Sequence, residues 1–538
     1  MATEALAPPQ IIPKRTVAAP TQEWKPAVNP WIIAMSVMMA TFMEVLDTSV
    51  ANVALPHIAG NLSASNDEAT WVLTSYLMAN AVVLPATGWL GRRFGRQRFL
   101  LFCLVLFTAS SFLCGFAVNL PMLIFARVLQ GAGGGALQPI AQAVLIESFP
   151  KEKQGQAIGV YGIGVVVAPI IGPVLGGWIT DNYSWRWVFY INVPIGVLAF
   201  FMLRQFVQDP PWIKSARASI GAIDGLGFAL MALWLGAQEV VLDKGQDDDW
   251  FSSNFIRGLA ITATLALAFF LIRELTAKGP IVDLRMLTDR NFGFGTLLIG
   301  VVGALLYGVT TLLPLFMQTL LGYSAYSSGL AIAPRGIGAL FGMGICGNLV
   351  GRIDGRLLAL FGFVACGVSC WQFSHLSLSM NPGTIFVSCL INGMSTAFMF
   401  VPLNTLSFGT LSREQIGNAT GVYNLMRNVG GSIGISIIST MLYRRAQAHQ
   451  SMMTEHLSPL NPRYQETLRG YAAGLAHQMS SSDASQKALG LLNGVVQRQA
   501  TMGAVIDIFQ GAVLMAGVAG ILVFILKNVK TRGPAGAH

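Results

Sequence analysis

The chain has 538 residues, of which 53% are hydrophobic and only 11% are charged, and its mean hydropathy is +0.58. Because soluble domains carry about 25% charged residues, this composition excludes a soluble protein and indicates an integral membrane protein. The net charge of +9 favours nucleic-acid binding only if the basic residues gather on one exposed face, whereas here they fall in loops between apolar runs.

Fourteen apolar runs are long enough to cross a membrane, since a bilayer core of about 30 Å needs roughly 20 apolar residues in a helix. The sequence therefore predicts an all-α membrane protein with fourteen transmembrane helices. The six cysteines lie in apolar runs without metal-ligand spacing, so we expect no metal and no cofactor. The runs lie near residues 31–56, 70–90, 99–118, 121–147, 156–180, 187–206, 220–241, 252–272, 293–320, 327–350, 357–377, 383–410, 417–443 and 503–526.

The N-terminal tail, residues 1–30, is polar and Pro-rich. It lacks the short apolar core and cleavage site of a signal peptide, so we expect it to stay on the chain. Because fourteen is an even number, both termini should lie on one side of the membrane. Most Lys and Arg residues fall in segments on that same side, whereas the loop 242–251 on the other side is acidic. The positive-inside rule then places both termini in the cytoplasm.

The first run carries two carboxylates near its middle, Glu44 and Asp47, and the fourth run carries Arg127 and Gln130 with the same spacing of three. That spacing puts each pair on one side of its helix. Ionisable groups inside a membrane are costly and are functional candidates by default. Burial and a nearby cation change the proton affinity of a carboxylate in opposite directions, so a small movement can load or release a proton. We therefore predict that Asp47 and Arg127 couple transport to protons; the alternative is a structural salt bridge that fixes helix packing.

Glu44 has three readings that the sequence leaves open. It is a second proton site, a cation-binding group in a substrate cavity, or a residue that faces water.

The second and tenth runs end in similar basic turns, "GWLGRRFGRQR" (88–98) and "GNLVGRIDGR" (347–356). Their spacing predicts two six-helix bundles with two inserted helices between them, as parallel repeats are arranged in some transporters. Glycines let the helix ends approach closely, and arginines can cap helix C-termini. The residues expected to shape the turns are Gly88, Gly91, Arg93, Gly95, Arg96, Arg352, Asp354 and Arg356.

The fifth run contains "GPVLGG" (172–177). Small residues let two helix backbones touch, and Pro173 bends the helix. A bent and tightly packed helix can hinge and seal against proton leak, although ordinary packing is the alternative. The residues concerned are Gly172, Pro173, Gly176 and Gly177.

The second half lacks a matching acid–base pair. Aligning "VALP" with "TLLP" places Leu305 opposite Asp47, and aligning "VLQGAGG" with "LINGMST" places Cys389 opposite Arg127. Coupling should therefore reside in the first half. Arg427 has no deep acid in its own half, so we expect a gating or structural role, with contact to an anionic substrate as the alternative; Arg335 is assigned to snorkelling or to cavity lining.

Residues 444–502 form a long polar segment that reads as two amphipathic helical pieces joined by a Ser-rich turn. Long loops are usually functional or disordered. The segment is either a solvated hairpin or a docking surface. The predicted divisions of the chain are an N-terminal tail (1–30), an N-terminal six-helix bundle (31–206), two inserted helices (207–275), a cytoplasmic linker (276–292), a C-terminal six-helix bundle (293–526, including 444–502) and a C-terminal tail (527–538).

These motifs, taken in order, resemble the fourteen-span drug:proton antiporters of the major facilitator superfamily (EmrB/QacA type). "LDTSVANVALP" (46–56) resembles their first-helix motif, and "GWLGRRFGRQR" resembles the superfamily loop G-x-L-x-D-R-x-G-R. "RVLQGAGGG" (127–135) and "APIIGPVLGG" (168–177) resemble the motifs of their fourth and fifth helices. "WRWVFYINVPIG" (185–196) and "LDKGQDDDWF" (242–251) look specific to the subfamily.

The resemblance implies a major facilitator fold and proton-driven export of hydrophobic or amphipathic toxic compounds across a bacterial inner membrane. The positions that match Asp47 and Arg127 are implicated in coupling within the family. The long segment 444–502 is similar to that of members of tripartite pumps, which implies a periplasmic membrane-fusion adaptor and an outer-membrane channel as partners. The chain departs from the family at Arg92 and Gly351, where the loop motif has an acid, so we expect a structural role for the turn rather than a charge relay.

An apolar cavity with sparse polar groups is expected between the bundles, suited to bulky amphipathic compounds rather than sugars. Export of a single metabolite, such as a siderophore or a fatty acid, is the nearest alternative. A membrane enzyme or sensor is disfavoured because no nucleophile–base cluster, metal spacing or phosphate loop occurs. The expected lining residues are Glu44, Asn52, Trp71, Tyr76, Asn80, Gln130, Tyr307, Gln318, Tyr423 and Arg427.

Overall fold

The computed structural model describes residues 26–211, 213, 224–277, 280–378, 382–412, 414–455, 457, 460–475 and 480–528. Predictions for the tail before residue 26 and for the tail after residue 528 lie outside the described residues. The described part is helical and contains no β-strand, with one isolated bridge between Val350 and Ile353. The predicted all-α class is confirmed.

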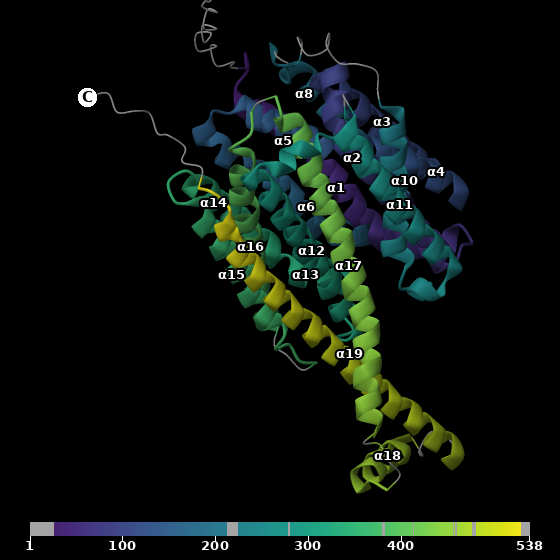
Figure 1. Ribbon diagram of the computed structural model, residues 1–538. Coiled ribbons are helices and arrows are strands. Elements are labelled where there is room, and N and C mark those ends of the chain that lie inside the picture. Colours follow the sequence, from purple (N-terminus) through teal and green to yellow (C-terminus); the bar gives the residue numbers. More distant parts are fainter. Residues whose placement is uncertain are drawn as a thin grey trace, which may run out of the picture.

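The helices fall into three successive groups (Figure 1). The first group contains α1 (Pro30–Asn61), α2 (Asn66–Phe94), α3 (Arg96–Phe116), α4 (Leu120–Gly134), α5 (Leu137–Ser148), α6 (Gln154–Asn182), α7 (Trp187–Tyr190) and α8 (Asn192–Phe206). Next come α10 (Gly225–Lys244) and α11 (Asn254–Thr276). The last group contains α12 (Arg290–Thr319), α13 (Ala325–Ile332), α14 (Pro334–Leu349), α15 (Gly355–Phe373), α16 (Pro382–Phe408), α17 (Ile416–Glu455), α18 (Pro462–Leu475) and α19 (Ser481–Leu522).

Twelve of the described helical segments are long and apolar enough to cross a membrane, and α6 makes thirteen if its two parts, bent by 41°, form one span. The remaining predicted run, 417–443, lies in α17, which is too polar to meet the same criterion. Its polar side chains are buried against other helices rather than facing lipid; Asn418, Thr420, Asn424 and Arg427 are all buried. The polarity of α17 therefore follows from its place inside the bundle, beside α12, α2 and α19.

The same helix pairings occur in the first and the last group. α1 packs on α6 as α12 packs on α17, and α2 packs on α4 as α14 packs on α16. Between the groups, α6 packs on α14 and α17 packs on α2. Glycines make two corresponding contacts possible: Gly131 of α4 leaves no room for a Cβ against the Tyr76 carbonyl of α2, and Gly393 of α16 leaves none against the Arg335 carbonyl of α14. Such close backbone approach is how helices pack in a membrane.

The two basic turns also share a backbone conformation. Gly95 and Gly351 have φ angles of +90° and +93°, in the region that glycine adopts most readily. The side chains differ: Arg96 is buried in an ion pair with Glu147, whereas Arg356 pairs with Asp354 at 2.7 Å near the surface. The hydrogen bonds from Arg356 hold the pKa of Asp354 below its ordinary value.

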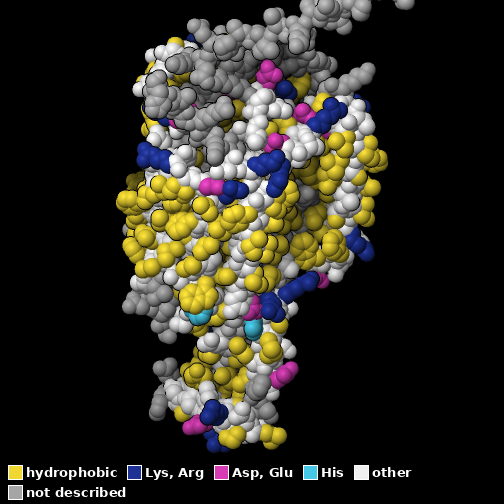
Figure 2. Space-filling model, turned by 60° about the vertical axis from the view of Figure 1, so that its left-hand side comes forward, with side chains coloured by type: hydrophobic (Ala, Val, Ile, Leu, Met, Phe, Trp, Pro, Cys, Tyr) yellow, Lys and Arg dark blue, Asp and Glu magenta, His cyan; other side chains and the backbone are white. Residues whose placement is uncertain are grey.

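On the face seen in Figure 2, a broad band of apolar side chains crosses the middle of the bundle, and Lys and Arg side chains border it. Large apolar residues exposed on the protein surface include Phe102, Phe125, Phe269 and Leu514. A band of this kind is what lipid contact requires. The start of α1 and the end of α19 lie at the same end of the bundle (Figure 1), as an even number of spans predicts.

Residues 444–502, called the extension below, project from the opposite end of the bundle (Figures 1 and 2). α17 and α19 both continue beyond the apolar band, and α18 packs on α19 at the tip. Ser480 caps α19 by accepting a hydrogen bond from the backbone N–H of Asp483. The predicted helical pieces are therefore observed, but the Ser-rich stretch begins α19 with Ser480 as its cap and is not a turn.

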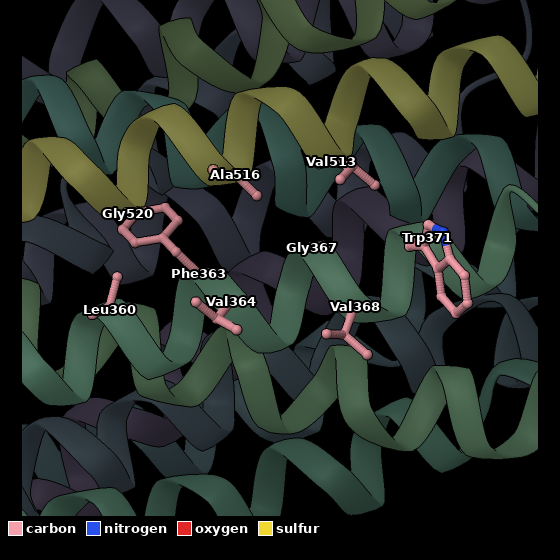
Figure 3. A pocket seen from close by; sticks show the side chains of 10 residues that line it. Leu360, Phe363, Val364, Gly367, Val368, Trp371, Val513, Ala516 and Gly520 are labelled. Atoms are coloured by element: carbon pink, nitrogen blue, oxygen red, sulfur yellow. The ribbon is translucent and has the colours of Figure 1, made fainter.

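A shallow apolar groove runs between α15 and α19 on the lipid-facing side (Figure 3). Phe363, Val364, Val513 and Ala516 line it, and Trp371 closes one end. None of the residues predicted to form the substrate cavity lines this groove.

Candidate functional site

Asp47 lies in the middle of α1 and is enclosed by three donors. Its Oδ2 accepts a hydrogen bond from Arg127 Nη1 at 2.5 Å in a fully buried ion pair. Its Oδ1 accepts from Gln130 Nε2 at 2.9 Å and from Asn192 Nδ2 at 2.6 Å. The structure thus brings together the pair that the sequence predicts, and it adds Asn192, the first residue of α8.

Arg127 is tied to α2 as well as to Asp47. Its Nε donates to the Val72 carbonyl at 3.0 Å, and its guanidinium lies 4.2 Å from the ring centre of Tyr76. Its Nη2 has no hydrogen-bond partner. A buried guanidinium with one ion-pair partner and a cation–π contact is sensitive to the charge of that partner, because little else compensates it.

Glu44 faces a different set of donors from Asp47, one helical turn away. Its Oε1 accepts from Tyr76 Oη and from Asn80 Nδ2, both at 3.1 Å, and its Oε2 accepts from Gln138 Nε2 of α5. The carboxylate is 3% exposed. The reading of Glu44 as a residue that faces water is therefore wrong, because every described neighbour of its oxygens is a protein side chain.

Gln138 connects Glu44 to the last group of helices. Its Oε1 accepts a hydrogen bond from Arg427 Nη2 of α17 while its Nε2 binds Glu44. Below it on α5, Gln142 binds Asn424 of α17 at 2.6 Å and also Asn404 of α16. Arg427 is therefore connected to a deep acid, Glu44, through the amide of Gln138. That acid lies in the first half of the chain, so an alignment of the two halves does not predict the connection.

The bend of α6 is coupled to α1. The break lies between Pro169 and Ile171, four residues before Pro173, where the missing N–H and the ring of a proline disturb the carbonyl. Ser49 of α1 donates its hydroxyl to that Pro169 carbonyl at 3.1 Å. Gly172 packs directly on Ser49. The bend predicted for Pro173 is observed, and its freed carbonyl bonds to the helix that carries Asp47.

The glycines of the fifth run differ in what they contact. Gly176 allows close approach to Val50 of α1, whereas a Cβ at Gly177 would meet open space. Gly177 therefore does not contribute the close packing predicted for it.

The first predicted turn lies where α2 meets α17. Gly88 packs directly on Asn418, and Arg92 Nη2 donates to Asn418 Oδ1 at 3.4 Å. Arg96 reaches Glu147, whereas a Cβ at Gly91 would meet only the Arg96 side chain. Arg93 and Arg352 are exposed.

The predicted cavity residues do not surround one open space. Tyr76 and Asn80 bind Glu44, and Gln130 binds Asp47. Trp71 is half-buried, Asn52 is exposed, and Tyr423 is buried against Phe408. Tyr307 packs on Gly431, and Gln318 lines a small separate pocket between α6, α12 and α13.

Four acids near the ends of the predicted runs have different surroundings. Glu147 and Glu239 are buried, against Arg96 and Ser432 respectively. Asp224 pairs with Arg273 at 2.9 Å, and the hydrogen bond from Arg273 holds the pKa of Asp224 below its ordinary value. Asp507 pairs with Arg445 and His449 at the base of the extension. Within the described residues, no group of three or more His, Cys, Asp or Glu side chains could hold a metal ion.

The sequence does not predict five amide residues of the site, because uncharged polar residues are common in apolar runs. They are Gln138, Gln142, Asn192, Asn404 and Asn424. Asn192 carried a weak signal, since it lies within the motif-like stretch "WRWVFYINVPIG". Gln138, Gln142, Asn404 and Asn424 carried none, and only their contacts across helices mark them.

Comparison with known proteins places these features in a family. The family model described as Major Facilitator Superfamily matches residues 37–435. The multidrug export protein EmrB of Escherichia coli is 39% identical over 447 residues, which cover 82% of this chain and 86% of that protein. The fatty acid resistance protein FarB of Neisseria gonorrhoeae is 37% identical over 475 residues, which cover 88% of this chain and 91% of that protein.

Two solved structures share the fold at low sequence identity. The human organic anion transporter MFSD10 has a TM-score of 0.60 at 11% identity, covering 92% of this chain and 100% of that chain. The proton:xylose symporter XylE has a TM-score of 0.55 at 13% identity, covering 92% and 95%.

Proposed function

Because this chain belongs to the major facilitator superfamily, we propose that it is a proton-driven antiporter that exports hydrophobic and amphipathic toxic compounds. The chain is a multi-pass membrane transporter rather than an enzyme. The multidrug export proteins among its relatives support the export role. The observation that carries the proton coupling is the buried Asp47–Arg127 pair.

Protonation of Asp47 changes what its neighbours can do. An ionised carboxylate accepts several hydrogen bonds, whereas a protonated one carries a donor and loses its charge. Arg127 then lacks its counter-ion while Val72 and Tyr76 hold it to α2. Uncompensated buried charge is strongly unfavourable, so proton loading favours a different α1–α4 arrangement. The Ser49 hydroxyl on Pro169 passes any movement of α1 to the bend in α6.

Glu44 is proposed as the second group that responds to protons or to a cationic substrate. Its carboxylate and Arg427 bind the two ends of one amide, Gln138, at the same time. A cationic substrate or a proton on Glu44 weakens the hold on Gln138, and Gln138 links the first group of helices to α17. Proton or cation binding at Glu44 would therefore loosen a contact between the first and the last group of helices. Alternating access requires that these two groups move relative to each other.

The coupling is tested by proton release from the purified protein on addition of substrate. We expect tetraphenylphosphonium, a weak-acid uncoupler or dodecanoate to release protons from the native chain, and Asp47→Asn to abolish the release while leaving the protein folded. Asp181→Asn, an exposed position on α6, is the matched control. Full proton-coupled transport by the Asp47→Asn variant would remove Asp47 from the mechanism. Glu44→Gln distinguishes its two roles, since it lowers either the protons released per substrate or the affinity for the cation alone.

We further propose that the chain lies in a bacterial inner membrane with both termini in the cytoplasm, and that it passes substrates to a periplasmic membrane-fusion adaptor and an outer-membrane channel. The extension supports an adaptor, because its apolar side chains face water. Leu460 at the tip is 90% exposed, and Leu489 and Leu491 on α19 are also exposed. Exposed apolar side chains that gather away from lipid mark interaction surfaces.

The adaptor surface is tested without deleting any helix. Leu460→Ser, Leu489→Lys and Leu491→Lys together should leave antiport in proteoliposomes unchanged but abolish resistance in whole cells. Lys487→Ser on the same helix is the control for a surface change without loss of apolar area. Undiminished resistance of cells with the triple variant would show that the extension is a solvated hairpin.

Export of amphipathic acids is a second candidate within the same class. The 37% identity to a fatty acid resistance protein favours it. The two candidate functions differ in the charge of the exported compound. The buried Arg335 could contact an anionic compound.

A further inference from the structure

Arg335 is a buried cation without a counter-ion. The side chain is 2% exposed, at the start of α14, and no ion pair forms with it among the described residues. Its Nη1 donates to Thr310 Oγ1 at 2.6 Å and its Nη2 to the Leu306 carbonyl at 3.2 Å, both on α12. Its Nε has no partner. An arginine cannot discard its proton to relieve this burial.

The neighbours of the guanidinium are neutral. Its hydrogen-bond partners are a hydroxyl and a backbone carbonyl, and Cys389, on the helix that packs on α14, is a buried free thiol. The deep acids of the protein are engaged elsewhere, Asp47 with Arg127 and Glu44 with Gln138. An isolated charge in a low-dielectric site is retained only where something repays its cost.

Arg335 lines a small cavity between the first and the last group of helices. α6 contributes Pro169 and Pro173 to the wall, at the bend described above, and α13 contributes Ser328 and Ile332. The cavity volume is about 30 Å³, which admits one or two waters or the oxygens of one head group, but not a whole amphipathic molecule. Gln318 lies on the same wall and is exposed, so the cavity has a polar residue that reaches its edge.

We propose that Arg335 is a binding site for the carboxylate head group of an amphipathic acid that the protein exports. A carboxylate pairs with a guanidinium in a geometry that supplies two hydrogen bonds, which satisfies the free Nε. The apolar tail extends along the prolines and Ile332 where α6 and α12 separate. This inference rests on the proposed export function and names one class of its substrates.

The test is equilibrium binding of dodecanoate and of dodecanamide to the full chain in phosphatidylcholine nanodiscs. The two probes have the same tail and similar head-group size, but the carboxylate is charged and only accepts hydrogen bonds, whereas the amide is neutral and also donates them. We expect the native chain to bind dodecanoate about 10-fold more tightly or better, the ratio for a charge-assisted hydrogen bond. Arg335→Gln should bind both probes equally, and Arg335→Lys should keep part of the preference. Arg257→Gln, an exposed arginine on α11, should behave as the native chain.

Three outcomes overturn the proposal. They are equal binding of both probes by the native chain, an undiminished dodecanoate preference in Arg335→Gln, and loss of the preference when phosphatidylglycerol replaces phosphatidylcholine. The last would assign the site to a lipid head group. Binding is measured without a proton gradient, so a failure of coupled transport counts against the proposed function alone, and a failure of this binding test counts against the anion site alone.

Discussion

Arg127 and Arg335 are both fully buried inside the membrane-spanning part of the protein, and they differ in their surroundings. Arg127 comes from α4 and meets the carboxylate of Asp47 on α1. Arg335 comes from α14 and meets a hydroxyl and a backbone carbonyl on α12, the helix that corresponds to α1. The first site carries its own counter-ion, whereas the second has none among the residues that the structure describes.

The two sites differ because their arginines come from helices that do not correspond. Arg127 lies on α4, whereas Arg335 lies on α14, which corresponds to α2. The position opposite Arg127 is Cys389 on α16, and Gly393, one helical turn later on α16, packs directly on the Arg335 backbone of α14. A cation is therefore present near the same place in both halves, but it is supplied by different helices. Leu305 replaces the acid, and the carbonyl of the next residue, Leu306, accepts a hydrogen bond from Arg335. A site with an internal acid responds to protons, whereas a site without one is left to bind an external anion.

The comparison predicts unequal effects on the free energy of unfolding when each cation is removed. Arg127→Gln leaves Asp47 buried without its ion-pair partner, so we expect a loss of about 3 kcal/mol or more in the free energy of unfolding. Arg335→Gln removes an uncompensated charge and loses two hydrogen bonds, and these terms offset each other to within about 1 kcal/mol. Thermal unfolding of both variants in one detergent measures the contrast.

The double variant Asp47→Asn with Arg127→Gln is the matched control for the first site. It removes both charges, so it should recover part of the stability that Arg127→Gln loses. Equal destabilisation by Arg127→Gln and Arg335→Gln would show that the two arginines have similar internal partners, and the distinction between the sites would fall.

The charged pair and the bend could be predicted from the sequence because both depend on residue type. A carboxylate or an arginine within an apolar run stands out, so the sequence alone marks Asp47, Glu44 and Arg127 as candidates. A proline inside a helix disturbs the carbonyl four residues earlier, so Pro173 predicts a bend in α6, and the structure shows where it lies. The helices themselves follow from run length, including the run 417–443 in α17, whose buried polar side chains lower its hydropathy.

The amide contacts could not be predicted because they depend on which helices meet. Gln138 binds Glu44 and Arg427 from opposite halves of the chain, and an internal alignment compares the halves without showing where they touch. Asn192 completes the Asp47 site from α8, far along the chain. For the same reason, the isolation of Arg335 became visible only when its neighbours could be identified, since a sequence gives a charge but not the absence of its partner.

A smaller effect tests whether the missing acid is what separates the two sites. Thr310→Asp places a carboxylate on the residue that already binds Arg335 Nη1 at 2.6 Å, which gives the second site the internal counter-ion of the first. The added acid should compete with dodecanoate and lower its binding several-fold, because an intramolecular partner is always present at high effective concentration. Thr310→Val removes the hydroxyl without adding charge and should leave the preference for dodecanoate over dodecanamide in place. If Thr310→Asp and Thr310→Val bind dodecanoate equally well, Arg335 is not the group that holds the head group, since a permanent counter-ion beside it would then have no effect.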